Sequence, residues 1–174
     1  MAAAVLARRA VQPSHSVAAT LADYALRFNH PGVPPLEPVF ANIEPVPGAT
    51  VYGVAHQITP GEALIFDNFE PGYRRISVSL HLADGAWVQA FAYTTIAPGA
   101  PGIPSARYLG LLIDGARAHG LPAALIAAWE ALRASASPIT QTTPLAADLQ
   151  AMHTRSPDRH LPADLLRTWE REEP

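Results

Sequence analysis

Alternating apolar and polar positions mark the middle of the chain as a β-hairpin. Every second residue is apolar from Ile76 to Leu82, which is the period of a strand with one buried face. Residues 87–95 alternate in the same way and place their aromatic side chains on one face. Asp84-Gly85 between the two stretches is a favoured two-residue turn. The pattern therefore predicts two antiparallel strands joined by a tight turn.

A capping box predicts a short helix ahead of this hairpin. In Thr59-Pro60-Gly61-Glu62 the Thr hydroxyl can accept the amide hydrogen of the Glu, whose carboxylate can reach back to the Thr amide. Pro fits the first helical position because its missing N–H would have no partner there. The apolar residues 63–66 continue the helix, and Pro71-Gly72 forces a turn after Glu70.

Further helices are predicted at the N-terminus and beyond the hairpin. Residues 2–10 are typical of the end of a helix. Ser105 can cap a helix that runs to residue 119, where Gly120 supplies the left-handed conformation that often follows a helix. Pro122 then opens another helix that continues through Arg133.

The rest of the pattern predicts two more strands and an appendage. Residues 22–28 and 51–58 are expected to be strands, and the Pro-rich stretch 30–47 is expected to be a loop. Strands that precede helices in this way indicate the α+β class. We expect one domain over residues 1–137 and a helical C-terminal appendage over residues 138–174.

Composition excludes several classes of function. With 12 Lys and Arg against 15 Asp and Glu the net charge is −3, so no nucleic-acid partner is expected. The chain has no Cys, which excludes disulfides, thiolate nucleophiles and Cys-based zinc sites. No apolar run approaches the roughly 18 residues that a membrane helix needs. We expect a cytoplasmic protein with no membrane partner.

Three catalytic motifs are missing or incomplete. The seven His residues form no HExxH pattern, so no metal site is expected. There is no Gly-x-Ser-x-Gly elbow of the kind that serine hydrolases use. Gly110 to Gly115 has the span of a P-loop, but it lacks the Lys-Ser/Thr pair and falls inside a predicted helix.

Several segments, taken in order, resemble the γ-glutamylcyclotransferases of the AIG2-like family. No single segment is diagnostic, but their order and spacing over about residues 20–133 make the match specific. The segments are Ala41–Gly48 leading into Val51–Val54, Phe66–Arg75, Ala90–Tyr93 and Pro104–Pro122.

The resemblance implies both a fold and a reaction. The fold is α+β, a small mixed β-barrel flanked by helices. In the reaction, the α-amine of a γ-glutamyl compound attacks its own γ-carbonyl and releases 5-oxoproline and an amine. Because the nucleophile belongs to the substrate, no cofactor or metal is expected. The expected partner is a small-molecule γ-glutamyl substrate, which the sequence leaves open among γ-glutamyl dipeptides, amines and capped metabolites.

The same resemblance makes Glu70 the candidate catalytic acid/base. One carboxyl group can serve both proton transfers if its pKa lies near the operating pH, and we expect an apolar wall of Phe69 and Tyr73 to raise that pKa. Tyr93 and Tyr108 are expected to hydrogen-bond the substrate's amino and carboxylate groups. The plainer interpretation makes Glu70 a solvated turn residue and both tyrosines core residues.

The N-terminus departs from the family pattern. Family members begin with a strand ending in Tyr-Gly-Ser-Asn, whose turn amides hold the γ-glutamyl group. Residues 1–9 here resemble the helix that follows that turn. Either the start codon is mis-assigned or the first strand has been lost. In the second case we expect a homodimer formed through the exposed strand edge, because unpaired edges recruit partners.

Three hypotheses about function follow. The first is a γ-glutamylcyclotransferase with Glu70 as base and then acid. The second is a catalytically degenerate relative that binds a small molecule or a partner chain. The third is a generic α+β interaction domain, which predicts an exposed Glu70 far from any pocket shared with Tyr93 and Tyr108.

Overall fold

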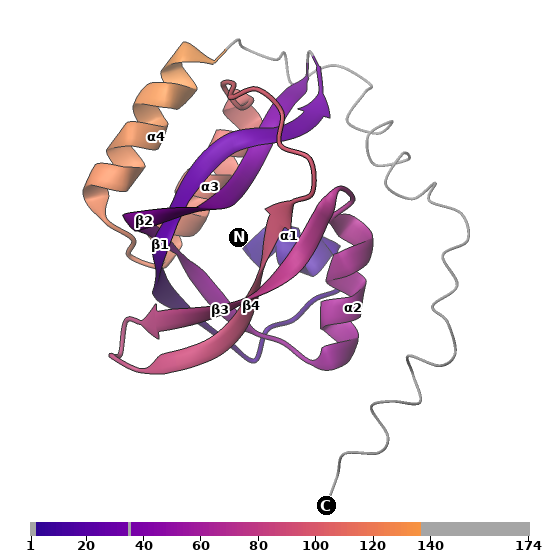
Figure 1. Ribbon diagram of the computed structural model, residues 1–174, viewed down its shortest axis with the longest axis vertical. Helices are drawn as coiled ribbons and strands as arrows, with labels where there is room; N and C mark the ends of the chain where they lie inside the picture. Colours follow the sequence, from indigo (N-terminus) through magenta and orange to yellow (C-terminus); the bar gives the residue numbers. More distant parts are fainter. Residues whose placement is uncertain (1–2, 35, 137–174) are drawn as a thin grey trace, which may run out of the picture. The chain divides into compact units, whose positions relative to one another are not determined.

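A four-stranded antiparallel sheet and four helices make up the part of the chain that the computed structural model describes, residues 3–34 and 36–136 (Figure 1). The elements are α1 (Ala3–Arg8), β1 (His15–Val33), β2 (Glu37–Gln57), α2 (Pro60–Phe69), β3 (Tyr73–Leu82), β4 (Trp87–Thr95), α3 (Ala106–Ala118) and α4 (Ala123–Ser135). The α+β class is confirmed. The expected mixed pairing is not seen among the described strands, which pair only antiparallel in the order β2-β1-β3-β4. The appendage expected at 138–174 lies outside the described residues.

The first two strands form a long ribbon where a loop was expected. Residues 30–47 were predicted to be irregular because of their prolines, but β1 and β2 pair from His15↔Gln57 to Val33↔Glu37 with two irregularities in register. The physical reason is that β2 lies at one end of the strand order. A proline has no N–H to donate, and an edge strand tolerates this because only one of its sides joins a ladder.

The predicted hairpin of β3 and β4 is present, but its turn is one residue longer than expected. The Leu82 amide donates to the Ala86 carbonyl at 2.8 Å, so the loop holds the three residues between them. The Gly85 amide donates to the Leu82 carbonyl at 3.0 Å, and Gly85 has φ +90°. A turn followed by one left-handed glycine is the common three-residue hairpin connection. The prediction of a two-residue turn was therefore wrong.

The predicted helix ends are confirmed. The Thr59 hydroxyl accepts from the Glu62 amide at 3.2 Å, and the Glu62 carboxylate accepts from the Thr59 amide at 2.8 Å. The Ser105 hydroxyl caps α3 by accepting from the Tyr108 amide at 3.0 Å. Gly120 takes the left-handed conformation with φ +65° just after α3. These are local hydrogen bonds, which is why neighbouring residue types were sufficient to predict them.

The helices pack in two pairs around different strands. One buried cluster joins α3 and α4 to β1 through Ile113, Ala116, Leu121 and Trp129, and Phe28 packs against it. A second cluster of Leu6, Val11 and Phe66 joins the N-terminal segment to α2, and Tyr93 of β4 packs against it. Figure 1 shows α2 alongside the β3–β4 hairpin and α3 and α4 alongside the β1–β2 ribbon. The candidate catalytic residue lies at the end of α2, beside the second cluster.

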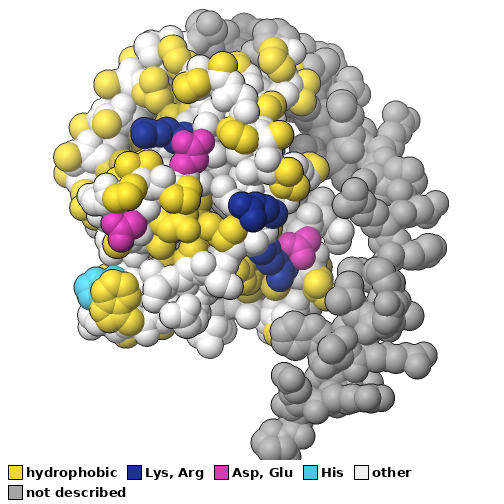
Figure 2. Space-filling view, in the orientation of Figure 1, with side chains coloured by type: hydrophobic (Ala, Val, Ile, Leu, Met, Phe, Trp, Pro, Cys, Tyr) yellow, Lys and Arg dark blue, Asp and Glu magenta, His cyan; other side chains and the backbone are white. Residues whose placement is uncertain are grey.

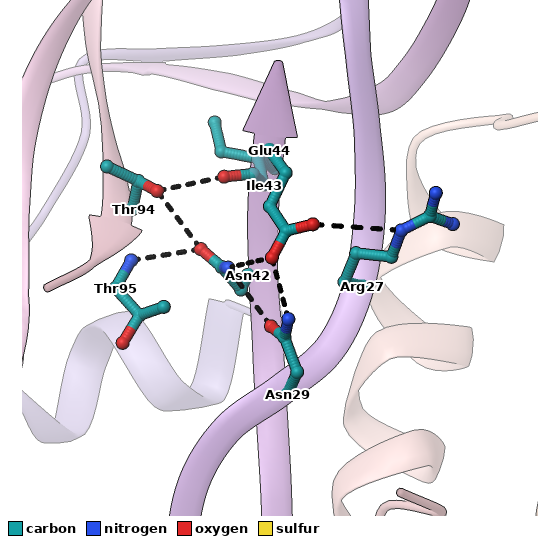
Figure 3. Close-up of polar contacts among 7 residues, drawn as sticks. All are labelled: Arg27, Asn29, Asn42, Ile43, Glu44, Thr94 and Thr95. Atoms are coloured by element: carbon teal, nitrogen blue, oxygen red, sulfur yellow. Dashed lines mark hydrogen bonds and ion pairs between the residues drawn. The ribbon is translucent and has the colours of Figure 1, made fainter. Parts of the chain in front are cut away.

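A buried polar network joins the two edge strands, β2 and β4 (Figure 3). The Asn42 Oδ1 accepts from the Thr94 hydroxyl at 3.1 Å and from the Thr95 amide at 2.9 Å. The Asn42 Nδ2 donates to the Asn29 Oδ1 at 3.0 Å, and the Asn29 Nδ2 donates to the Glu44 carboxylate at 2.6 Å. These bonds tie β4 back to β2 although β1 and β3 separate them in the sheet. The sheet is therefore curled toward a barrel by side chains.

Candidate active site

A tight turn holds Glu70 at the end of α2. The Tyr73 amide donates to the Glu70 carbonyl at 3.2 Å, with Pro71 and Gly72 as the two central residues. Gly72 has φ +81°, the value that the third position of a type II turn requires, and Pro favours the second position. The turn therefore fixes Glu70 and Tyr73 as neighbours at the junction of α2 and β3. The predicted Pro-Gly turn is confirmed.

Arg9 forms an ion pair with the Glu70 side chain. The Arg9 Nη1 lies 2.5 Å from the Glu70 Oε1, and the two side chains are 19% and 16% exposed. The Arg9 guanidinium also lies over the rings of Phe66 and Phe69, 5.7 and 5.2 Å from their centres. Phe69, which was expected to form part of an apolar wall around the carboxylate, lies against the Arg9 guanidinium. An adjacent arginine stabilises the ionised form of a carboxyl group.

Tyr73 and Tyr108 both bond to the backbone of one residue, Ala41. The Tyr73 hydroxyl donates to the Ala41 carbonyl at 2.6 Å, and the Ala41 amide donates to the Tyr108 hydroxyl at 3.2 Å. Burial raises the pKa of Tyr73, and burial raises the pKa of Tyr108 to about 12. The Pro71-Gly72 turn joins Glu70 to Tyr73, and both phenols bond to Ala41, so Glu70 belongs to the same group of contacts. The negative charge of Glu70 adds to the rise in both pKa values. Both hydroxyls are therefore protonated at neutral pH and can donate hydrogen bonds.

His30, which lies on β1, packs against Tyr73 and bonds to Thr95 of β4. Its ring stacks on Tyr73 with 3.9 Å between ring centres, and its Nδ1 lies 2.8 Å from the Thr95 hydroxyl. A Cβ at Gly72 would come within 2.9 Å of the His30 ring, so a side chain there would meet both strain and a clash. Burial lowers the pKa of His30, which favours the neutral imidazole. His30 therefore acts as an aromatic support for Tyr73 and as a partner for β4.

The Tyr93 hydroxyl bonds to the side chains of Asp67 and Arg75, whereas those of Tyr73 and Tyr108 bond to Ala41. Its hydroxyl donates to the Asp67 Oδ1 at 2.8 Å and accepts from the Arg75 Nε at 3.3 Å. The Arg75 Nε also donates to the same Asp67 oxygen at 2.7 Å, and its guanidinium lies over the Phe91 ring. Burial raises the pKa of Tyr93 to about 12. The Tyr93 hydroxyl thus joins α2 to the hairpin, and a role for Tyr93 in binding substrate stays a prediction.

The structure brings Glu70 and Tyr108 together, as the cyclotransferase hypothesis requires. Glu70 is largely buried, whereas the hypothesis of a generic interaction domain expected it to be exposed. The sequence analysis missed Arg9, which is 61 residues from Glu70 and gives no local signal. It treated Tyr73 only as part of an apolar wall, although the spacing Glu-Pro-Gly-Tyr of a turn signals that the two residues are neighbours.

Charges on the described surface are sparse. On the face in Figure 2 the charged side chains stand singly or beside one of opposite sign, among hydrophobic and uncharged ones. Within residues 3–34 and 36–136, no cluster of three or more His, Cys, Asp and Glu residues is placed to hold a metal ion. No helix among these residues is both long enough and apolar enough to cross a membrane.

Part of the chain matches a protein-family model. The AIG2-like family model matches residues 50–128, which include Glu70, Tyr93 and Tyr108 but not Arg9. None of the curated proteins is similar enough to this sequence to count as a match.

Solved structures share the fold at low sequence identity. A protein described as a gamma-glutamyl cyclotransferase has a TM-score of 0.67 and 19% identity, and the alignment covers 88% of this chain and 92% of the other. An uncharacterized human protein has a TM-score of 0.62 and 21% identity, with coverage of 80% and 83%. YkqA from Bacillus subtilis has a TM-score of 0.60 and 18% identity, but the alignment covers 71% of this chain and only 45% of YkqA. At these identities the likeness concerns the fold alone.

Proposed function

Because the AIG2-like family model matches residues 50–128, we propose that this chain is a γ-glutamylcyclotransferase whose catalytic acid/base is Glu70. The observation that carries the proposal is the position of Glu70. A largely buried carboxylate lies at the end of α2, near two phenols that stay protonated at neutral pH. A solved structure of similar fold is described as a gamma-glutamyl cyclotransferase, which supports the same assignment.

The proposed reaction needs a proton carrier and hydrogen-bond donors. Glu70 takes a proton from the substrate's α-ammonium, and the free amine attacks the γ-carbonyl carbon to form the lactam C–N bond. The bond from that carbon to the departing nitrogen breaks as Glu70 returns its proton to the leaving amine. In total two protons leave the α-nitrogen and two reach the departing nitrogen, so the net charge is unchanged. Glu70 ends in the ionised state in which it began.

Tyr108 is the better placed of the two predicted substrate-binding tyrosines. Its hydroxyl accepts a hydrogen bond from Ala41 and keeps its own hydrogen to donate. A donor aimed at a carbonyl or carboxylate oxygen would stabilise negative charge on the substrate. Tyr93 would first have to exchange its bond to Asp67.

The test is 5-oxoproline release from a panel of γ-glutamyl dipeptides and γ-glutamylamines. Glu70→Gln keeps the size of the side chain but removes its ability to carry a proton. We expect the rate to fall roughly 10²–10⁴-fold, the usual contribution of a positioned acid/base. Glu130→Gln is the matched control, because Glu130 also pairs with an arginine, Arg117, but does so between α3 and α4. Equal activity of Glu70→Gln and the control would contradict the assignment.

A specific observation favours a second candidate, a catalytically degenerate relative that binds its ligand without turnover. Glu70 already has a cationic partner in Arg9, and such a pair can be purely structural. The same panel separates the two candidates. Binding of a γ-glutamyl compound detected by calorimetry, with no 5-oxoproline formed by the folded wild-type chain, would favour the binding protein.

A further inference from the structure

We propose that Arg9 determines specificity by binding the substrate's α-carboxylate while Glu70 receives the α-ammonium. This inference rests on the proposed function, because it names the group that Arg9 recognises in that site. Arg9 lies outside residues 50–128, so the family match does not assign it a role.

The first argument is charge pairing. Arg9 and Glu70 place a cation and an anion in contact, 2.5 Å apart. The α-carbon of a γ-glutamyl compound carries an ammonium and a carboxylate, also a cation and an anion side by side. If the substrate enters between the two side chains, its ammonium meets Glu70 and its carboxylate meets Arg9. Each of the four charges then has a neighbour of opposite sign, so no buried charge is left unpaired.

The second argument is the hydrogen-bonding capacity of Arg9. A guanidinium carries five N–H donors in a planar fork, which suits a carboxylate with two oxygens. Among the contacts of the described residues, the Arg9 side chain makes one hydrogen bond, from Nη1 to Glu70. Further donors are therefore available for a second carboxylate. A lysine would offer a point charge without this fork.

The third argument is that Arg9 is held in place while staying accessible. The rings of Phe66 and Phe69 lie beneath its guanidinium, and Leu6 and Val11 on either side of it in sequence are buried beside Phe66. The Arg9 side chain is nevertheless 19% exposed and that of Glu70 is 16% exposed. A cation fixed by aromatic rings needs little ordering when a ligand arrives, and low ordering cost favours binding.

The fourth argument is that the neighbouring groups are complementary to such a ligand. The Tyr108 hydroxyl can donate to an oxygen and is bonded to the backbone of Ala41, which also accepts from Tyr73, the neighbour of Glu70 across the Pro71-Gly72 turn. Arg9 and Tyr108 therefore both belong to the group of contacts around Glu70, where they can bind different groups of one small molecule.

The experiment changes the substrate and the protein in turn. Turnover is measured for a γ-glutamylamine with a free α-carboxylate and for the same compound with an α-carboxamide. We expect wild type to favour the carboxylate, with a kcat/KM at least about tenfold higher, because a charge-assisted pair is lost with the amide. Arg9→Gln should lower kcat/KM for the carboxylate much more than for the carboxamide, so that the preference disappears. Arg9→Lys should restore part of it.

The controls separate this inference from the proposed function. Arg117→Gln removes an arginine from an ion pair with Glu130 and should leave the preference intact. Equal slowing of both substrates by Arg9→Gln, or a wild type that does not distinguish them, would overturn the role of Arg9 while leaving the cyclotransferase in place. The wild-type comparison needs no variant to fold.

If wild type turns over neither compound, the proposed function fails and binding decides the inference. Calorimetry then compares L-glutamine, which carries both charges, with its α-carboxamide. Tighter binding of L-glutamine to wild type, lost in Arg9→Gln, would support carboxylate recognition by Arg9. Binding of neither compound would overturn it.

Discussion

The Asn42 network and the Glu70 site are both polar groups set among apolar ones, but they are built differently. Asn42 is 3% exposed, and its amide donates and accepts bonds within the strands of one sheet. The Glu70 carboxylate is 16% exposed, and its partner Arg9 comes from the N-terminal segment. Among the described residues, Glu70 accepts a hydrogen bond from Nη1 of Arg9, and the remaining N–H groups of Arg9 are available as donors. A saturated network fits a structural role, and an accessible pair with spare donors fits a binding role.

The largest effect on stability is expected from Asn42→Ala. The change leaves the buried Thr95 amide and the Asn29 side chain each short of a partner, and an unsatisfied buried group costs about 1–3 kcal/mol. We expect the free energy of unfolding to fall by roughly 2–4 kcal/mol in urea titrations. Glu70→Gln, measured alongside, should cost less than Asn42→Ala, because the Gln amide oxygen can still accept a hydrogen bond from Arg9. Similar losses in both variants would contradict the distinction drawn between the two regions.

A smaller effect is expected from Tyr108 at alkaline pH. Burial raises the pKa of Tyr108 to about 12 in the folded state, above its ordinary value near 10. Unfolding therefore releases a proton between these values, so stability is fully present below pH 10 and is lost as pH rises toward 12. By pH 11 the loss should be roughly 1 kcal/mol from this group. Tyr108→Phe should flatten that part of the curve of unfolding free energy against pH, and an unaltered curve would refute the account.

The smallest effect is expected from Arg117→Gln. The Arg117 and Glu130 side chains are 53% and 39% exposed, so solvent screens their attraction. We expect a change in unfolding free energy below about 0.5 kcal/mol and no change in 5-oxoproline release. A large loss of stability would mean that exposure is a poor guide to the role of the ion pairs in this chain, and would weaken the comparison.

Local features of the fold were predictable from the sequence. The capping box at Thr59, the cap at Ser105 and the left-handed Gly120 each depend on residues within one helical turn, and all three are confirmed. The hairpin followed from alternation alone. The error at its turn also had a local cause, because Asp-Gly suits both two- and three-residue connections. Register decides between the two, and register depends on the whole pairing of β3 with β4.

Features that depend on distant contacts were not predictable. The prolines between residues 30 and 47 indicated a loop. Those in β2 fit a strand because β2 lies at the edge of the sheet, and Pro31 fits because β1 pairs with β3 only at Ala19 and Thr20. Glu70 and Tyr108 were predicted as site residues from a family resemblance. No rule of sequence spacing would have indicated that they lie in one site. Arg9 was missed because a cation's partner is decided by packing, here of Leu6 and Val11 against Phe66.

The separation of 61 positions along the chain between Arg9 and Glu70 also affects the order in which the site can form during synthesis. At a synthesis rate of about 5–20 residues per second, Arg9 leaves the ribosome roughly 3–12 s before Glu70, and Tyr108 follows later still. The β1–β2 ribbon lies wholly between Arg9 and Glu70 in the sequence. It can therefore form before Glu70 is synthesised and can pair with Arg9. Arg9 is therefore synthesised well before it can pair with Glu70. Until Glu70 emerges, the N-terminal segment is exposed to chaperones and proteases.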